Sequence, residues 1–144
     1  KHLLTSDQSV LAEMTSLLRG NIHNYVEYAL DYVWAGQYQE ALDLLDLGMS
    51  FQQSVYPMAY YYKGWILDKI GNVDLAKQAM EKAEKCSPDY CFPNQLESVL
   101  ALQCAVRLNA KSDKAHYYLG NFWYAARQVE NAIKCWEKSI QIIY

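Results

Sequence analysis

The chain has 144 residues, of which 52% are hydrophobic and 20% are charged, and its formal net charge is −3. These values describe a globular domain that can bury a core, and they exclude a disordered chain and a basic nucleic-acid-binding surface. No apolar run reaches the roughly 18 residues of a membrane span. With 3 prolines and 6 glycines, the composition also disfavours an all-β fold with many turns.

The first expected element is a lone helix over 9–19, where apolar residues recur at helical spacing until Gly20. A helix pair over 22–53 follows, and Gly36 divides it into two helices. Because the connection at Gly36 is so short, the two helices must lie antiparallel and adjacent. A lone helix at this end indicates a repeat whose other half lies upstream, so we expect the chain to be an excerpt of a longer protein.

A second helix pair is predicted over 57–88, divided at Gly71, and a third over 113–144. Pro57 suits the first turn of its helix, because proline lacks the N–H group that has no partner there. Between the second and third pairs, the stretch 93–109 predicts a single helix. Its apolar arc is wide, which suggests burial on more than one side.

Each predicted pair carries two small residues twelve positions apart. These residues are Ala29 and Ala41, Gly64 and Ala76, and Gly120 and Ala132. A small residue lets two helices approach closely at their crossing, and large neighbours fill the space on either side. A helix pair that recurs in this way indicates an α-solenoid.

The residues around the small positions resemble the tetratricopeptide repeat (TPR) family, whose period is about 34 residues. The resemblance is most specific in the second and third pairs. It is carried there by Tyr60, Gly64, Leu67, Gly71, Ala76, Met80, Ala83 and Pro88, and by His116, Leu119, Gly120, Trp123, Ala132, Trp136 and Ser139. It implies an all-α fold over 1–144, a TPR-like α-solenoid of antiparallel helix pairs with one inserted lone helix. Arg127 departs from the pattern, since a glycine is usual at that place.

A run that includes PNQLESVLAL and HYYLGNFWY is also similar to the C-terminal regions of large uncharacterised bacterial proteins. Those proteins carry a β-rich N-terminal domain and occur in carbohydrate-related settings. This resemblance implies a bacterial parent protein. It leaves open a role as an accessory module that docks on or dimerises a catalytic domain of the same chain, for example a carbohydrate-active one.

The TPR resemblance places the first helix of each pair along a concave groove. The groove-facing residues that it implies are Val26, Leu30 and Val33; Met58, Tyr61, Trp65 and Asp68; and Lys114, Tyr117, Asn121 and Tyr124. We expect partner side chains to be buried against the aromatic residues of the last two sets, with Lys114 and Asn121 as polar anchors. Two alternatives remain open: another part of the same protein packs there, or the aromatic residues belong to the core between repeats.

We therefore interpret the chain as a scaffold for protein–protein interaction that binds a peptide or a partner protein, not as an enzyme. The sequence contains no Gly-rich phosphate loop and no Ser/His/Asp or Cys/His constellation, so we expect no catalytic residue and no cofactor. The partners expected are a protein, a peptide or another domain of the same chain, and no nucleic acid. Stacking of sugar rings on the aromatic residues is a third interpretation. The apolar last turn would also allow a homo-oligomer through terminal helices.

The four cysteines show no CxxC pair and no zinc-finger spacing, so we expect no metal site. They are Cys86, Cys91, Cys104 and Cys135. We expect them to act as small buried hydrophobic residues in a reducing, cytoplasmic compartment. A disulfide between Cys86 and Cys91 is the alternative.

Overall fold

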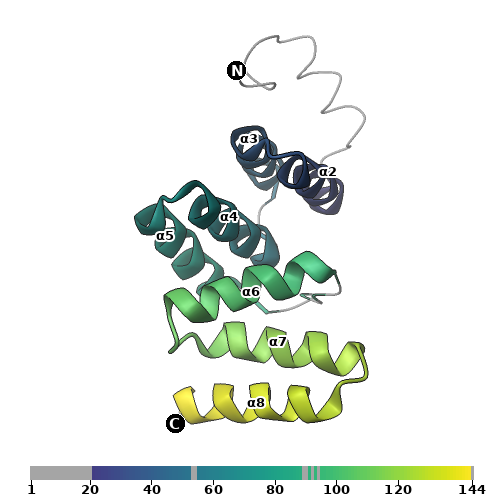
Figure 1. The fold of residues 1–144 in the computed structure, drawn as a ribbon, viewed down its shortest axis with the longest axis vertical. Coiled ribbons are helices and arrows are strands. Elements are labelled where there is room, and N and C mark those ends of the chain that lie inside the picture. Colours follow the sequence, from purple (N-terminus) through teal and green to yellow (C-terminus); the bar gives the residue numbers. More distant parts are fainter. Residues whose placement is uncertain (1–20, 53–54, 89–90, 92, 94, 144) are drawn as a thin grey trace.

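The computed structural model describes residues 21–52, 55–88, 91, 93 and 95–143, and within these ranges the regular structure is entirely α-helical (Figure 1). The helices are α2 (Ile22–Trp34), α3 (Tyr38–Ser50), α4 (Pro57–Ile70), α5 (Val73–Glu84), α6 (Leu96–Leu108), α7 (Asp113–Ala125) and α8 (Val129–Ile143). The predicted all-α fold is therefore confirmed. The lone helix predicted over 9–19 lies outside the described residues.

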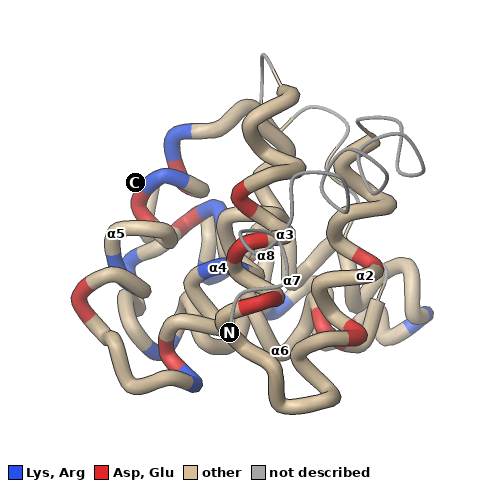
Figure 2. Tube along the Cα trace, turned by 90° about the horizontal axis from the view of Figure 1, so that it is seen from above, with Lys and Arg blue, Asp and Glu red and all other residues tan. Residues whose placement is uncertain are grey.

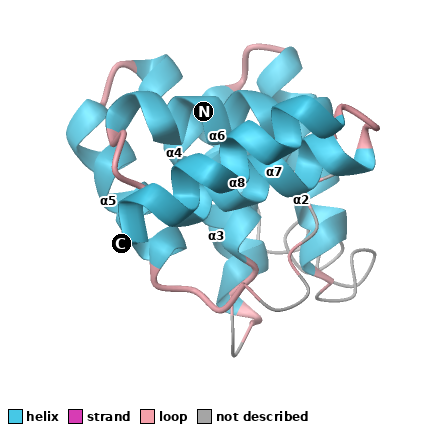
Figure 3. Cartoon of the chain, turned by 90° about the horizontal axis from the view of Figure 1, so that it is seen from below, coloured by secondary structure: helices cyan, strands magenta, loops and turns pink. Residues whose placement is uncertain are grey.

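The described helices form three antiparallel pairs, α2/α3, α4/α5 and α7/α8, and α6 lies between the second and third pairs. The layers follow one another along the long axis of the molecule, and α8 is the outermost layer at the C-terminal end (Figures 1 and 3). The fold is thus a TPR-like α-solenoid with one inserted helix, as predicted from the sequence. Lys and Arg are interspersed with Asp and Glu along the described trace (Figure 2).

Small residues lie where the two helices of a pair cross, as the sequence suggests. A Cβ atom added at Gly64 would lie 2.7 Å from the Met80 Cε atom and 3.1 Å from the Ala76 carbonyl oxygen, so glycine favours the close approach of α4 to α5. In the last pair the Trp136 indole occupies the same space beside Gly120. In α2/α3 the small residue lies on the second helix instead of the first, because the Tyr25 ring of α2 packs against Gly48 of α3. Every pair therefore closes around one small residue and one large side chain.

The turns inside the pairs use a left-handed residue at one equivalent position. Gly36 and Gly71 adopt φ angles of 80° and 96°, which cost glycine little. In α7/α8 the corresponding residue is Arg127, with a φ of 63°. A non-glycine residue in this region is strained, so the departure noted in the sequence has a physical consequence.

The inserted helix α6 packs mainly on α4 and α7. At its N-terminal end, the Ser98 and Tyr62 hydroxyl oxygens lie 2.8 Å apart in a hydrogen bond. Toward its C-terminal end, Arg107 pairs with Asp68 of α4 at 2.5 Å. Buried residues of α6 contact neighbours on two sides, as its wide apolar arc predicted.

Candidate functional site

Three of the predicted groove residues on α4 lie in the core. Met58, Tyr61 and Trp65 are all buried. The Tyr61 ring meets Tyr118 of α7 edge-on, with the ring centroids 5.9 Å apart. The Trp65 ring meets Trp34 of α2 in the same way at 6.3 Å. The expectation that these three side chains line an open groove is thereby corrected, because α6 packs on α4 and rings of α7 and α2 cover Tyr61 and Trp65.

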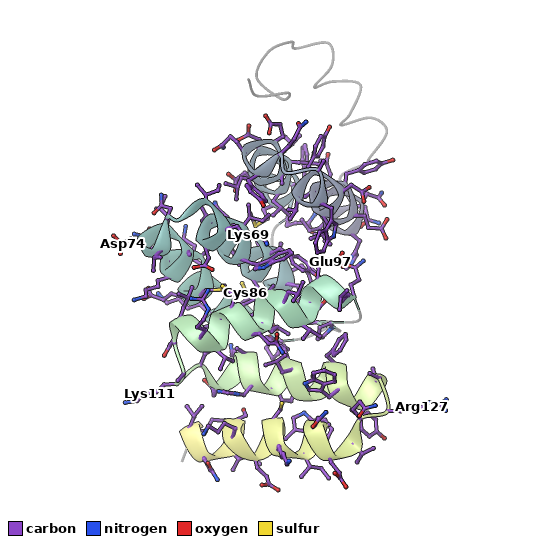
Figure 4. The ribbon with its side chains drawn as sticks, in the orientation of Figure 1. Lys69, Asp74, Cys86, Glu97, Lys111 and Arg127 are labelled. Carbon is purple, nitrogen blue, oxygen red and sulfur yellow. The ribbon has the colours of Figure 1, made fainter. Side chains whose placement is uncertain are left out.

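The groove residues expected on α2 are also buried, namely Val26, Leu30 and Val33. Beside them, Trp34 donates a hydrogen bond from Nε1 to the Glu97 carboxylate of α6 at 2.7 Å. Figure 4 shows Glu97 at the N-terminal end of α6, on the side that faces α2. Contacts among α2, α4 and α6 therefore close this part of the predicted groove.

The two charged residues predicted for the groove are already engaged within the chain. Asp68 forms the ion pair with Arg107 described above. Lys114 donates from Nζ to the backbone oxygens of Glu84 at 2.5 Å and Cys86 at 3.0 Å. A lysine on the last carbonyl groups of a helix stabilises that helix end. Lys114 thus holds the end of α5, which corrects its expected role as a free polar anchor.

The remaining predicted residues, Tyr117, Asn121 and Tyr124, follow one another along α7. Tyr117 is 43% exposed and Tyr124 is 59% exposed, so both rings are accessible. Asn121 is half-buried and accepts a hydrogen bond from Trp136 Nε1 at 3.2 Å. Three of the eleven predicted groove residues therefore share an accessible surface.

Helix α8 extends this surface, and the sequence analysis missed its exposure. The exposed aliphatic residues of α8 are Val129, Ile133, Ile140 and Ile143. Their spacing of four, seven and three residues keeps them on one side of the helix. Only Ala132 and Ser139 of α8 are buried. The sequence signal for this surface is the apolar stripe itself, which recurs at helical spacing over 129–143.

Trp136 joins the two helices of this surface. The centroid of its ring lies 5.7 Å from that of the Tyr124 ring, and its Nε1 donates a hydrogen bond to the Asn121 side-chain oxygen. We call the combined surface the α7/α8 face. It consists of Tyr117, Asn121, Tyr124, Val129, Ile133, Trp136, Glu137 and Ile140.

A half-buried carboxylate lies near the start of α7. Glu84 accepts hydrogen bonds from the Tyr61 hydroxyl at 3.4 Å and from the Ser112 hydroxyl. Burial raises the pKa of the Glu84 carboxyl above its usual range, and the nearby Asp113 carboxylate adds to the shift. Glu84 lines a small cavity of about 180 Å³ between α5 and α6. Within the described residues, no group of three or more His, Cys, Asp or Glu side chains could hold a metal ion.

All four cysteines are free thiols in the structure. Cys91 and Cys104 are buried, as predicted, whereas Cys86 and Cys135 are half-buried. Burial raises the pKa of Cys91 to about 12 and that of Cys104 to about 11. Thiols with a raised pKa are weak nucleophiles at neutral pH.

Comparisons with known proteins concern the fold alone. No protein-family model and no curated protein matches the chain. A crystal structure of MamA is similar with a TM-score of 0.44 and 18% identity, over 93% of this chain and 65% of that one. The MamA RS-1 ArsTM double mutant is similar with a TM-score of 0.46 and 21% identity, over 93% of this chain and 82% of that one. MamA 41-end from Desulfovibrio magneticus RS-1 is similar with a TM-score of 0.43 and 21% identity, again over 93% of this chain and 82% of that one.

The chain thus spans 65% of the length of the first of these structures. At such identities and TM-scores, the likeness carries no information about partners or activity. Among the described helices, none is long and apolar enough to cross a membrane.

Proposed function

We propose that the chain is a protein-interaction module that binds its partner on the α7/α8 face. The observation that carries the proposal is the exposure of Tyr117, Tyr124 and the aliphatic row of α8 on adjacent helices. A contiguous apolar surface of this kind on a folded domain indicates an interaction site. Tyrosine supplies a large rigid contact at little cost in side-chain entropy, and it is frequent at binding hot spots.

The face also has polar groups that would orient a partner. Asn121 keeps its amide nitrogen available while its oxygen accepts from Trp136. Glu137 is exposed beside the aliphatic row. An apolar centre with a few polar groups at its edge is the usual composition of a protein interface.

The competing function is an accessory module, in which the same face docks on a catalytic domain of the parent protein. The surface chemistry of the face is the same in both cases, so the two functions differ only in which chain supplies the partner. An experiment that identifies the chain attached to the face separates them.

A photo-cross-linking amino acid at position 124, introduced into the parent protein in its own cells, provides that experiment. A cross-link from position 124 to a separate polypeptide, without one from position 28, supports the proposal. Tyr28 is a matched control, because it is an exposed tyrosine on α2 at the far end of the solenoid. A cross-link only within the parent chain would establish the accessory role. Equal labelling from both positions, or none from either, would refute a specific partner on this face.

A further inference from the structure

Helices α3 and α8 are the second helices of their pairs, and their crossing residues, Ala41 and Ala132, are equivalent. Counting onward from these alanines, the residues that follow on α3 are Leu42, Asp46 and Met49, and those on α8 are Ile133, Glu137 and Ile140. Both rows therefore read aliphatic, acidic, aliphatic along one side of a helix.

On α3 this row is covered by the next helix of the chain. Helix α4 packs on α3, and Leu42 is only 6% exposed. Lys63 of α4 places Nζ 2.8 Å from the Asp46 carboxylate. The acidic residue of the row on α3 therefore forms an ion pair with a basic residue of the helix that covers it.

The corresponding row of the second pair is charged and mostly exposed. Lys77 and Glu84 of α5 occupy the positions of Leu42 and Met49. With Met80 they line the small cavity whose other wall is formed by Ala105 and Leu108 of α6. Because Lys77 and Glu81 are exposed, α6 approaches this side of α5 only at the cavity, and the α3/α4 contact is the one that the row on α8 resembles.

In the last described pair the same row is open. Ile133 is 45% exposed and Ile140 is 56% exposed, although their counterpart Leu42 is buried. Glu137 is exposed as well, and no described cation pairs with it in a salt bridge. The row on α8 therefore has the side-chain pattern of the helix-receiving row on α3, but it is exposed.

We propose that the α7/α8 face receives one amphipathic α-helix of a partner, laid on α8 as α4 is laid on α3. The contact residues of α4 define the chemistry of that helix. Tyr60, Lys63 and Leu67 line a common surface depression with Leu42 and Asp46. The partner helix accordingly carries a large apolar residue, a Lys or Arg three positions later, and an aliphatic residue four positions after that. This inference rests on the proposed function and specifies its partner.

The charge pattern favours such a partner over a second copy of α8. If two copies of α8 packed antiparallel through this row, Ile133 of one copy would lie opposite Ile140 of the other. The two Glu137 side chains then meet near the centre of the contact, since position 137 lies midway along the row. Like charges at adjacent positions of paired helices are destabilising. A basic residue opposite Glu137 removes this repulsion and adds an ion pair.

A stapled peptide with the sequence of residues 56–71 of this chain is the probe. The staple joins positions 65 and 69, which lie on the side of the helix opposite Tyr60, Lys63 and Leu67. Its binding to the whole 144-residue chain is measured by fluorescence anisotropy, together with a peptide that carries Lys63→Glu. We expect the charge-reversed peptide to bind roughly three- to fivefold more weakly, the effect that a partly exposed ion pair supports.

Variants of the chain show whether the peptide occupies the α7/α8 face or competes with α4 for α3. Ile133→Asp is expected to weaken binding by about tenfold. Glu137→Lys is expected to reverse the preference, so that the Lys63→Glu peptide binds more tightly. Glu27→Lys makes the same charge change on an exposed residue of α2 and should leave the preference unchanged. Ile133 and Glu137 are exposed, and circular dichroism of each variant verifies that it folds.

Three results would overturn the inference. The first is no binding of either peptide, and the second is binding that neither Ile133→Asp nor Glu137→Lys alters. The third is a dimer of the chain in sedimentation equilibrium that Ile133→Asp abolishes, because a second copy would then cover the face. If the peptides fail while position 124 still cross-links to a separate protein, the proposed function stands and only the helical partner is refuted.

Discussion

The indole ring of Trp136 packs against the backbone of Gly120 and fills the space that a Cβ at position 120 would need. Gly120→Ala is therefore expected to destabilise the fold by about 1–3 kcal/mol, as overpacking of a close helix contact does. Urea denaturation monitored by circular dichroism measures this loss. Adding Trp136→Met, the residue found at the equivalent position 80, should recover part of the stability, because methionine can bend away from the new methyl group. A double variant no more stable than Gly120→Ala would contradict this account.

Replacing Arg127 with glycine is expected to stabilise the turn between α7 and α8. Arg127 has a φ of 63°, and a non-glycine residue there carries strain of about 1–3 kcal/mol. Glycine relieves the strain but adds about 0.4–1 kcal/mol of unfolded-chain entropy. Arg127→Gly should therefore raise the free energy of unfolding by about 1 kcal/mol. Arg127→Ala keeps the strain and is the matched control, so an equal gain from both variants would refute the explanation.

Trp65 and Tyr124 are expected to respond differently to truncation. Trp65 is buried against Trp34, so Trp65→Ala should cost about 3–5 kcal/mol and lower the melting temperature strongly. Tyr124 is 59% exposed, and Tyr124→Ala should change stability by less than about 1 kcal/mol. Thermal denaturation of both variants, with Tyr117→Ala as a second surface control, measures the contrast. Similar losses for Trp65→Ala and Tyr124→Ala would mean that the α7/α8 face is part of the core.

The different places of these two aromatic residues show what the sequence could predict. The helix pairs were predictable because small residues such as Gly64 and Ala76 recur at fixed spacing and local signals end each helix. The burial of Trp65 was not predictable in this way, because it depends on a contact with Trp34 in another helix pair. The packing of α6 on α4 likewise brings together distant residues, such as Arg107 and Asp68, which form an ion pair 39 positions apart. No periodic pattern encodes a contact at that separation.

The stripe on α8 illustrates the complementary limit. The spacing of Ile133 and Ile140 in the sequence is that of residues on one side of a helix, and both lie on α8. Periodicity does not say whether another element covers that side. Only the burial of Leu42, set against the exposure of Ile133 at the equivalent position, reveals that the row on α8 is open.

Glu84→Gln is expected to stabilise the chain at neutral pH and to have less effect in acid. Burial raises the pKa of the Glu84 carboxyl, so the folded state holds a proton more tightly than the unfolded state does. The stability that this proton contributes is fully present below the unfolded pKa of about 4.3. It is lost as the pH rises through the higher folded pKa. Glutamine keeps an oxygen that can accept from Tyr61 and Ser112, without the charge.

Urea denaturation of the wild type and Glu84→Gln at pH 4 and pH 7.5 measures this dependence. The variant should be the more stable protein at pH 7.5, and the difference between the two proteins should shrink at pH 4. Glu81→Gln is the control, because Glu81 is exposed on the same helix and should show little change between the two pH values. A loss of stability in Glu84→Gln at pH 7.5 would have a different meaning. It would show that the ionised carboxylate stabilises the start of α7 through its hydrogen bond with Ser112 and the positive charge of Lys114. That stabilisation would then exceed the free-energy cost of burying the charge.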